Sequence, residues 1–315
     1  MHIKKSFYIV SFLGFIGLNH LSAQINPFQK SVTEFTNPII WADAPDLSIT
    51  RNGDDFYLIS TTMHLMPGAP VMHSKDLVHW EMSGYVFNTL NDNSKYDLLN
   101  GTVYGRGQWA SSIRYHKGKY YVLFSPNDEP FKSYFYVTDN PEKGSWKLIT
   151  RTKHFHDASL FFDDDDRVYV FTSNKVFELS PDFKNIVGDQ NGIEIFQKDA
   201  SETGLLEGNQ MIKKDGKYYM MMISWPRNEK RRQVVYRADK VTGPYEKKVV
   251  LEDNFLGFSY AGQGALIDDK NGNWYSLIFQ DRNGVGRVPI LLPVKWENDC
   301  PVLGDNGKVP LHFEI

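Results

Sequence analysis

The sequence predicts an all-β protein folded as a five-bladed β-propeller. Five segments repeat one pattern, in which a short polar turn opens a run of aromatic and β-branched residues. They recur roughly every 50 residues, which is enough chain for four short strands in each unit. From residue 24 onward, no amphipathic helical pattern extends over ten residues, so the units are expected to consist of strands alone.

Each repeated segment has the pattern of a β-hairpin. The segments read "NGDDFYLIS", "KGKYYVLF", "DDRVYVF", "DGKYYMMM" and "NGNWYSLIF". Asn, Asp and Gly favour tight turns, and the aromatic and branched residues that follow favour strands. The second aromatic positions are Tyr57, Tyr121, Tyr169, Tyr219 and Tyr275, at intervals of 64, 48, 50 and 56 residues.

The second half of each unit predicts two further strands. The segments "PVMHSKDLVHWEMSGYVF", "SYFYVTDNPEKGSWKLI" and "RRQVVYRADKVTGPYEKKVVL" each show a strand, a polar turn and another strand. Four strands for each unit complete the expected blades.

The first 23 residues are expected to be a secretory signal peptide. Lys4 and Lys5 precede the apolar run "FYIVSFLGFIGL", and the small residue Ala23 ends the segment. Residues 24–315 would then form a single catalytic propeller without a C-terminal β-sandwich. Gln24 follows the expected cleavage site, so no cysteine there could carry a lipid anchor. We therefore expect an exported protein, periplasmic or secreted, with no membrane anchor.

Charge and cysteine content exclude several classes of function. Losing Lys4 and Lys5 with the signal peptide changes the formal net charge from −3 to −5, and no basic run follows. Nucleic acid is therefore not an expected partner. Cys300 is the single cysteine, which excludes an internal disulfide and cysteine-based metal sites.

One position recurs in all five units and gathers the candidate site residues. It lies twelve residues before the second aromatic in units two to five and eleven before it in unit one. The residues there are Asp46, Trp109, Asp157, Glu207 and Gln263. This position begins the strand before each hairpin turn, which is the innermost strand of a blade, so the five side chains are expected to converge at one end of the axis.

Three carboxyl groups in one pocket predict acid–base chemistry. Mutual repulsion and burial raise the pKa of at least one of them, while another stays ionised. A protonated acid facing an ionised base is the equipment for glycoside hydrolysis. Calcium coordination, or turns that are merely rich in Asp, is the alternative explanation.

Several motifs, taken in order, resemble glycoside hydrolase family 43, especially its β-xylosidase and α-L-arabinofuranosidase members. They are "NPIIWADAPDLSITRNGDDFY", "QWASSIRYHKGKYYVLF", "HDASLFFDDDDRVYVF", "LLEGNQMIKKDGKYYMM" and "GQGALIDDKNGNWYSLIFQDRNGVGRVPILLPVKW". The resemblance runs from about Asn26 to the C-terminus and implies a five-bladed propeller with inverting catalysis. It implies that Asp46 is the general base, Glu207 the general acid, and Asp157 the acid that tunes pKa and orients the substrate. It also implies that Arg287, in "GRVP", contacts the substrate.

The chain departs from the family pattern in two places. Gly208–Asn209–Gln210 follows the expected acid where members usually have Gly-Pro-His or similar. Gln263 stands where many members carry a histidine associated with a central metal. The resemblance implies no required cofactor, and it leaves a structural calcium open, with Gln263 counting against it; the sequence identifies no metal ligands.

Several other residues could belong either to the substrate site or to the structural core. Trp109 is interpreted as a sugar-stacking platform, and Trp41, Asp43, His64 and Gln263 as further substrate contacts, with a structural role as the alternative. The remaining interpretations are structural: Trp80, Trp146 and Trp296 are expected in the core, and the acidic run 163–166 is expected to be a solvated turn.

The predicted function is an inverting exo-glycosidase acting on pentose-containing plant polysaccharide or its oligosaccharides. A non-catalytic carbohydrate-binding propeller is the alternative, and a scaffolding propeller is a third hypothesis. The carboxyl triplet favours catalysis over both. Xylose versus arabinose, the linkage and the oligomeric state stay open.

Overall fold

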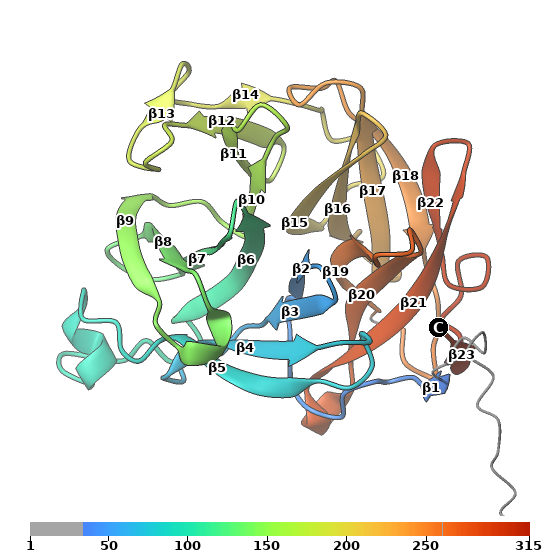
Figure 1. The fold of residues 1–315 in the computed structure, drawn as a ribbon, viewed down its shortest axis with the longest axis horizontal. Helices are drawn as coiled ribbons and strands as arrows, with labels where there is room; N and C mark the ends of the chain where they lie inside the picture. Colours follow the sequence, from blue (N-terminus) through green and yellow to red (C-terminus); the bar gives the residue numbers. More distant parts are fainter. Residues whose placement is uncertain (1–33, 260) are drawn as a thin grey trace, which may run out of the picture.

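The computed structural model describes residues 34–259 and 261–315, which form five β-sheets around a central axis (Figure 1). The predicted signal peptide, residues 1–23, lies outside the described residues. In chain order the blades are β2–β5, β6–β9, β10–β14, β15–β18 and β19–β22. Every pairing within a blade is antiparallel. The predicted five-bladed propeller is confirmed.

The first strand of each blade lies next to the axis, and the following strands lie progressively further out (Figure 1). The innermost strands are β2 (Ser48–Asn52), β6 (Gln108–His116), β10 (Ser159–Phe162), β15 (Leu205–Lys214) and β19 (Ala261–Asp268). The second strands are β3 (Asp55–Ile59), β7 (Lys119–Pro126), β11 (Val168–Thr172), β16 (Lys217–Trp225) and β20 (Trp274–Asp281). The third strands are β4 (Gly68–Ser74), β8 (Lys132–Thr138), β12 (Lys175–Leu179), β17 (Arg232–Ala238) and β21 (Arg287–Glu297). The outer strands are β5 (Glu81–Phe87), β9 (Lys147–Lys153), β13 (Ile186–Val187) with β14 (Ile193–Glu194), β18 (Glu246–Leu251) and β22 (Cys300–Leu303).

The repeated aromatic residues lie on the second strands, as the hairpin pattern predicts. In the fourth blade the turn residues Asp215 and Gly216 have φ of 50° and 77°, as the turn of a two-residue hairpin requires. Helical structure in residues 34–259 and 261–315 is limited to the 3₁₀ turns η1 (Ser94–Asp97), η2 (Pro141–Lys143) and η3 (Asn283–Val285). Within those ranges no helix has the length and apolar character needed to cross a membrane.

The core consists of five hydrophobic clusters, each between two neighbouring blades. Side chains alternate between the two faces of a strand, so "YYMMM" on β16 packs against two neighbours. Met220 and Met222 join the cluster shared with the third blade, whereas Tyr219 and Met221 join the cluster shared with the fifth. A second strand is therefore apolar at consecutive positions because both of its faces are buried.

The three tryptophans expected in the core are partly buried and pack against it. Trp80, Trp146 and Trp296 each contact a different one of the inter-blade clusters. The expectation of a solvated acidic run was wrong for Asp163, which is buried. Its carboxyl group accepts hydrogen bonds from Lys213 Nζ (2.6 Å) and Tyr218 Oη (2.6 Å), and so ties the third blade to the fourth.

The ring is closed by a clasp, which we define as residues 34–44 together with the strand β23 (His312–Glu314). Strand β1 (Glu34–Thr36) pairs antiparallel with β23, so the two ends of the described chain lie together (Figure 1). Buried Asn37 donates to the carbonyl groups of Leu291 (2.8 Å) and Pro310 (2.9 Å) and accepts from the Leu291 amide. Backbone amides of Ile39 and Ala44 then bond to carbonyl groups of β21.

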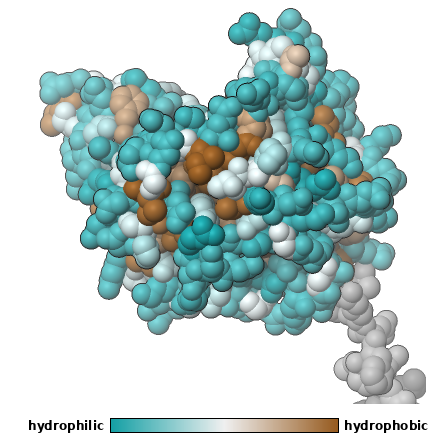
Figure 2. Space-filling view, turned by 90° about the horizontal axis from the view of Figure 1, so that it is seen from above, coloured by the Kyte–Doolittle hydropathy of each residue, from teal (hydrophilic) through white to brown (hydrophobic). Residues whose placement is uncertain are grey.

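Seen from above, the surface is mostly hydrophilic, and hydrophobic residues gather around a hollow in this view (Figure 2). The five innermost strands begin at one end of the axis and finish at the other. Three of them are bulged near their start, between Gln108 and Ser111, Glu207 and Gln210, and Ala261 and Gly264. Bulges bend a strand and redirect its side chains, so the start of the inner strands is the irregular end of the molecule.

Candidate active site

The three predicted carboxylates lie where the innermost strands begin. Asp46 and Asp157 each precede the first residue of their strand, Ser48 or Ser159, by two positions, and Glu207 is the third residue of β15. Asp46 and Asp157 both adopt left-handed backbone conformations, with φ of 56° and 43°. Non-glycine residues rarely adopt this conformation, and Asp tolerates it better than most. The two aspartates therefore enter the site from the same kind of strained turn.

Asp46 is buried and forms an ion pair with Arg287. Its Oδ1 accepts from Arg287 Nη1 at 3.0 Å, across the join between the first and fifth blades. Burial raises the pKa of Asp46, the Arg287 guanidinium opposes that rise, and the charges of Glu207 and Asp43 add to it. The net direction is upward, and Arg287 is the largest of the influences that favour the ionised form of this carboxyl group.

A second cluster contains Asp157, Glu207 and a residue that the sequence analysis missed, His156. His156 Nε2 lies 3.1 Å from Glu207 Oε2 and 3.9 Å from Asp157 Oδ1. One carboxylate oxygen of Asp157, one of Glu207 and a His156 nitrogen all lie within 4.8 Å of one another. Burial raises the pKa of Asp157 to about 7, with Glu207 and Asp46 adding to the rise and His156 opposing it. The hydrogen bond to Glu207 raises the pKa of His156 to about 8.

Trp109 and Gln263, the other two residues of the recurring position, lie on bulged segments. Trp109 donates its Nε1–H to the Gly105 carbonyl at 2.9 Å, and its ring is tilted against His156 at 5.8 Å between centroids. Gln263 is buried and packs against Gly208, where a Cβ atom would lie 2.2 Å from the Gln263 side chain. Trp109 therefore borders the acid cluster, whereas Gln263 supports the backbone beside Glu207.

The remaining predicted contacts have structural partners. Asp43 Oδ1 accepts from the Arg287 amide at 2.7 Å, which fixes the loop that carries Arg287. His64 stacks on Tyr104, with 3.9 Å between ring centroids, and accepts from the Gly105 amide, so it orients the loop that also supports Trp109. Trp41 is 64% exposed, and the Arg282 guanidinium lies over its ring.

The orientation of the Gln263 amide does not favour a calcium site. Calcium takes oxygen ligands. The atom of Gln263 that lacks a partner is Nε2, a donor that a cation cannot satisfy. Two groups of His, Asp and Glu in the described residues place donor atoms close together: Asp55 with His73 and Glu142, and His156 with Asp157 and Glu207. Hydrogen bonds and ion pairs within the groups, and contacts with Tyr57 and Lys75, engage these residues, and we assign no metal to either group.

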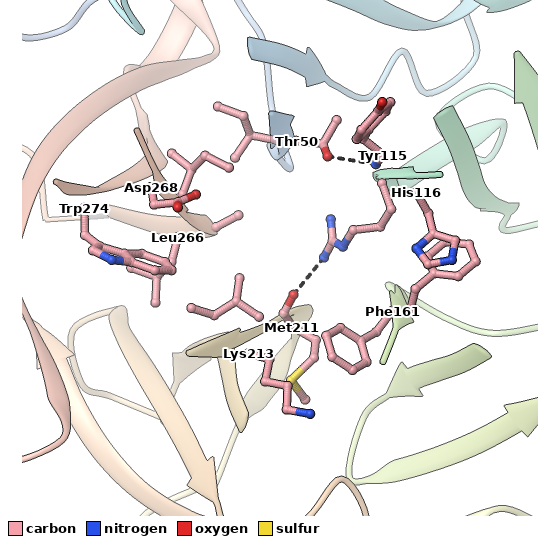
Figure 3. A pocket seen from close by; sticks show the side chains of 15 residues that line it. Thr50, Tyr115, His116, Phe161, Met211, Lys213, Leu266, Asp268 and Trp274 are labelled. Atoms are coloured by element: carbon pink, nitrogen blue, oxygen red, sulfur yellow. Dashed lines mark hydrogen bonds between the residues drawn. The ribbon is translucent and has the colours of Figure 1, made fainter. Parts of the chain in front are cut away.

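The opposite end of the axis holds a separate cavity of about 240 Å³ (Figure 3). The later residues of the same five inner strands line it, including Thr50, His116, Phe161, Lys213 and Asp268. Arg114 lies between this cavity and the acid cluster. Its guanidinium donates to Ser48 Oγ, Ser159 Oγ, Gln210 Oε1 and the carbonyl groups of Ile113 and Met211, and burial lowers its pKa to about 10. This network crosses the axis and separates the cavity from the cluster of Asp46, Asp157 and Glu207 at the end where the strands begin.

The arrangement suits paired acid–base chemistry. Asp46 comes from the first blade and Glu207 from the fourth, and these blades are not neighbours in the ring. The carboxyl group of Asp46 is paired with the Arg287 guanidinium. The carboxyl group of Glu207 is paired with the His156 imidazole, beside Asp157. Two carboxyl groups in such different surroundings can take the separate roles of base and acid.

Comparison with known proteins agrees with this geometry. Residues 35–301 match the family model described as "Glycosyl hydrolases family 43". The "Non-reducing end alpha-L-arabinofuranosidase BoGH43B" of Bacteroides ovatus is 32% identical over 91% of this chain and 56% of its own length. The "Beta-xylosidase" of Formosa agariphila is 29% identical over 86% of this chain and 50% of its own length. A solved structure titled "Bifunctional GH43-CE", from Bacteroides eggerthii, is 42% identical with a TM-score of 0.80, over 90% of this chain and 37% of its own. The chain thus spans about half the length of the curated relatives it matches.

Proposed function

This chain belongs to glycosyl hydrolases family 43, and on that premise we propose that it is an inverting exo-glycosidase that releases pentose from plant polysaccharide or its oligosaccharides. The relatives named as a β-xylosidase and an α-L-arabinofuranosidase support a pentose as the released sugar. The carbohydrate is the proposed partner, and we propose that the protein is exported to meet it, as the first 23 residues indicate.

In the proposed mechanism, Asp46 is the general base and Glu207 the general acid. Asp46 takes a proton from water as the water attacks the anomeric carbon, and Glu207 gives a proton to the departing glycosidic oxygen. Inversion needs roughly 6.5–9.5 Å between the two carboxyl groups, so that a water molecule fits between the sugar and the base. Arg287 favours the ionised form of Asp46, and Asp157 lies close enough to Glu207 to influence its charge and orientation.

One observation carries this proposal. Two carboxyl groups on non-neighbouring blades meet at one end of the axis, one paired with Arg287 and the other with His156. A carbohydrate-binding propeller has no need of the buried carboxyl groups of Asp46 and Asp157, whose pKa values are raised, because burying a charge is costly. Catalysis does need them.

The test compares two variants on two substrates. Glu207→Gln should abolish turnover of natural glycosides, whose sugar-alcohol leaving groups need a proton, and should spare much more activity on an aryl glycoside with an acidic phenol. Asp46→Asn should damage both activities alike, because water must be activated whichever group leaves. The measurement is kcat/KM relative to wild type, with the first-formed anomer followed by NMR. Asp54→Asn, which changes an exposed carboxyl group in a hairpin turn, is the control.

Three results would count against this function. Tight sugar binding with no release of pentose above background would establish the carbohydrate-binding alternative. Retention at the anomeric carbon would exclude the proposed mechanism. Equal losses for Glu207→Gln on the two substrates would mean that Glu207 binds the sugar and that the acid lies elsewhere.

A further inference from the structure

We infer that His156 is a positioning residue for the general acid, because its ring nitrogen holds one oxygen of the Glu207 carboxyl group and leaves the other for the leaving group. This inference rests on the proposed function. His156 directly precedes Asp157 in the chain, so one short segment delivers both an imidazole and a carboxyl group to Glu207.

The contact is specific to one oxygen. Nε2 of His156 lies 3.1 Å from Oε2 of Glu207, within hydrogen-bonding distance, whereas the nearest Asp157 oxygen lies 3.9 Å away. Donation from Nε2 fixes the plane of the carboxyl group. The Glu207 side chain is 31% exposed, so it is open to a ligand from the side that His156 does not occupy.

Three neighbours hold the segment and the ring. The His156 carbonyl group accepts from the Thr172 hydroxyl at 2.5 Å, which anchors the backbone to the second strand of the third blade. Trp109 packs against one side of the imidazole at 5.8 Å, and His154 stacks at 6.3 Å between ring centroids. The imidazole is thus held in place before a substrate arrives, as a positioning residue must be.

The charge of the His156 imidazole adds to the effect of its position beside Glu207. Glu207, Asp157 and Asp46 face the ring and favour the imidazolium, whereas burial and His154 oppose it. An imidazolium stabilises the negative charge that forms on Glu207 as it gives up its proton. As the pH rises the imidazolium gives way to the neutral imidazole, and this stabilisation is lost. The benefit from His156 should therefore be greatest at acidic pH and should fade as the imidazolium loses its proton near pH 8.

The kinetic test uses His156→Ala, which removes the contact, and His156→Gln, which keeps a donor but no charge. His156→Ala should lower kcat on an alkyl or sugar-alcohol glycoside about tenfold or more, with a smaller change in KM and in turnover of an acidic aryl glycoside. His156→Gln should recover part of the loss. The ratio of wild-type to His156→Gln activity should fall between pH 5 and pH 9. His79→Gln, at an exposed site in the first blade, is the matched control.

A structural role for His156 predicts different results. Equal losses on both glycosides, or a ratio that does not change with pH, would overturn the inference. A second measurement keeps it testable if the protein releases no pentose and the proposed function fails. In ¹⁵N NMR the imidazole of His156 should titrate near pH 8 in wild type and at a lower pH in Glu207→Gln, and an unchanged titration would refute the contact itself.

Discussion

Replacing Asp157 with Asn should stabilise the protein at alkaline pH while lowering its activity. Burial, together with the charges of Glu207 and Asp46, raises the pKa of Asp157 to about 7 against the opposing charges of His156 and Arg287. An amide at this position has nearly the same shape and carries no charge at any pH. The variant therefore isolates the cost of burying this carboxylate.

The sign and size of the effect follow from the pKa. In the unfolded chain Asp157 has its ordinary pKa of 3.8, so the folded protein holds this proton more tightly. The contribution to stability is complete below pH 3.8 and is lost as the pH rises through about 7. The difference between these pKa values, at about 1.4 kcal/mol for each pH unit, corresponds to at most about 4 kcal/mol.

The assay is urea unfolding of wild type and Asp157→Asn between pH 4 and pH 8.5. The free energy of unfolding of Asp157→Asn, relative to that of wild type, should increase by up to about 4 kcal/mol as the pH rises across this range. The control variant Asp54→Asn should show no such trend. The same variant should lose activity, and the alkaline limb of its pH–rate profile should move to lower pH. A stability difference that is constant from pH 4 to pH 8.5 would refute the reasoning.

Three other variants test the surroundings of the site. Arg287→Met removes the cation that opposes the raised pKa of Asp46, so the acidic limb of kcat/KM should move to higher pH; an unmoved limb would separate Arg287 from the base. Gly208→Ala forces a Cβ atom against Gln263 at a φ of 73°, so the free energy of unfolding, measured by heat or urea, should fall by about 1–3 kcal/mol. A variant as stable as wild type would contradict the close contact between Gly208 and Gln263. Glu202→Ala removes the carboxylate that lies 3.1 Å from buried Arg232, so the free energy of unfolding in urea should fall by about 3 kcal/mol or more. A fall below about 1 kcal/mol would mean that solvent replaces the carboxylate at the Arg232 guanidinium.

The blade architecture could be predicted because its signal is local. A short polar turn followed by a run of aromatic and β-branched residues predicts a hairpin wherever it occurs, and five copies predict a ring. The recurring position before each turn likewise brought Asp46, Asp157 and Glu207 to one end of the axis. Counting residues could not show the bulges at Glu207 and Gln263, because a bulge changes the register without changing the composition.

Side-chain partners from distant blades could not be predicted. His156 lies beside a predicted residue, yet its contact with Glu207 joins the third blade to the fourth. Asp163 looked like a solvated turn residue until Lys213 and Tyr218 supplied its partners. Such contacts depend on how neighbouring blades pack, and a single strand contains no record of that packing.

The clasp couples the closure of the ring to Asp46, the proposed general base. Residues 37–44 run along β21 and lead directly into Asp46, whose guanidinium partner Arg287 opens that same strand. Release of this segment would separate Asp46 from Arg287 while each blade kept its own hairpins. Local opening of this kind costs less free energy than global unfolding. Heat should therefore abolish activity at a lower temperature than the one at which the strands unfold. Loss of activity would then be the first measurable sign that the ring of blades has opened.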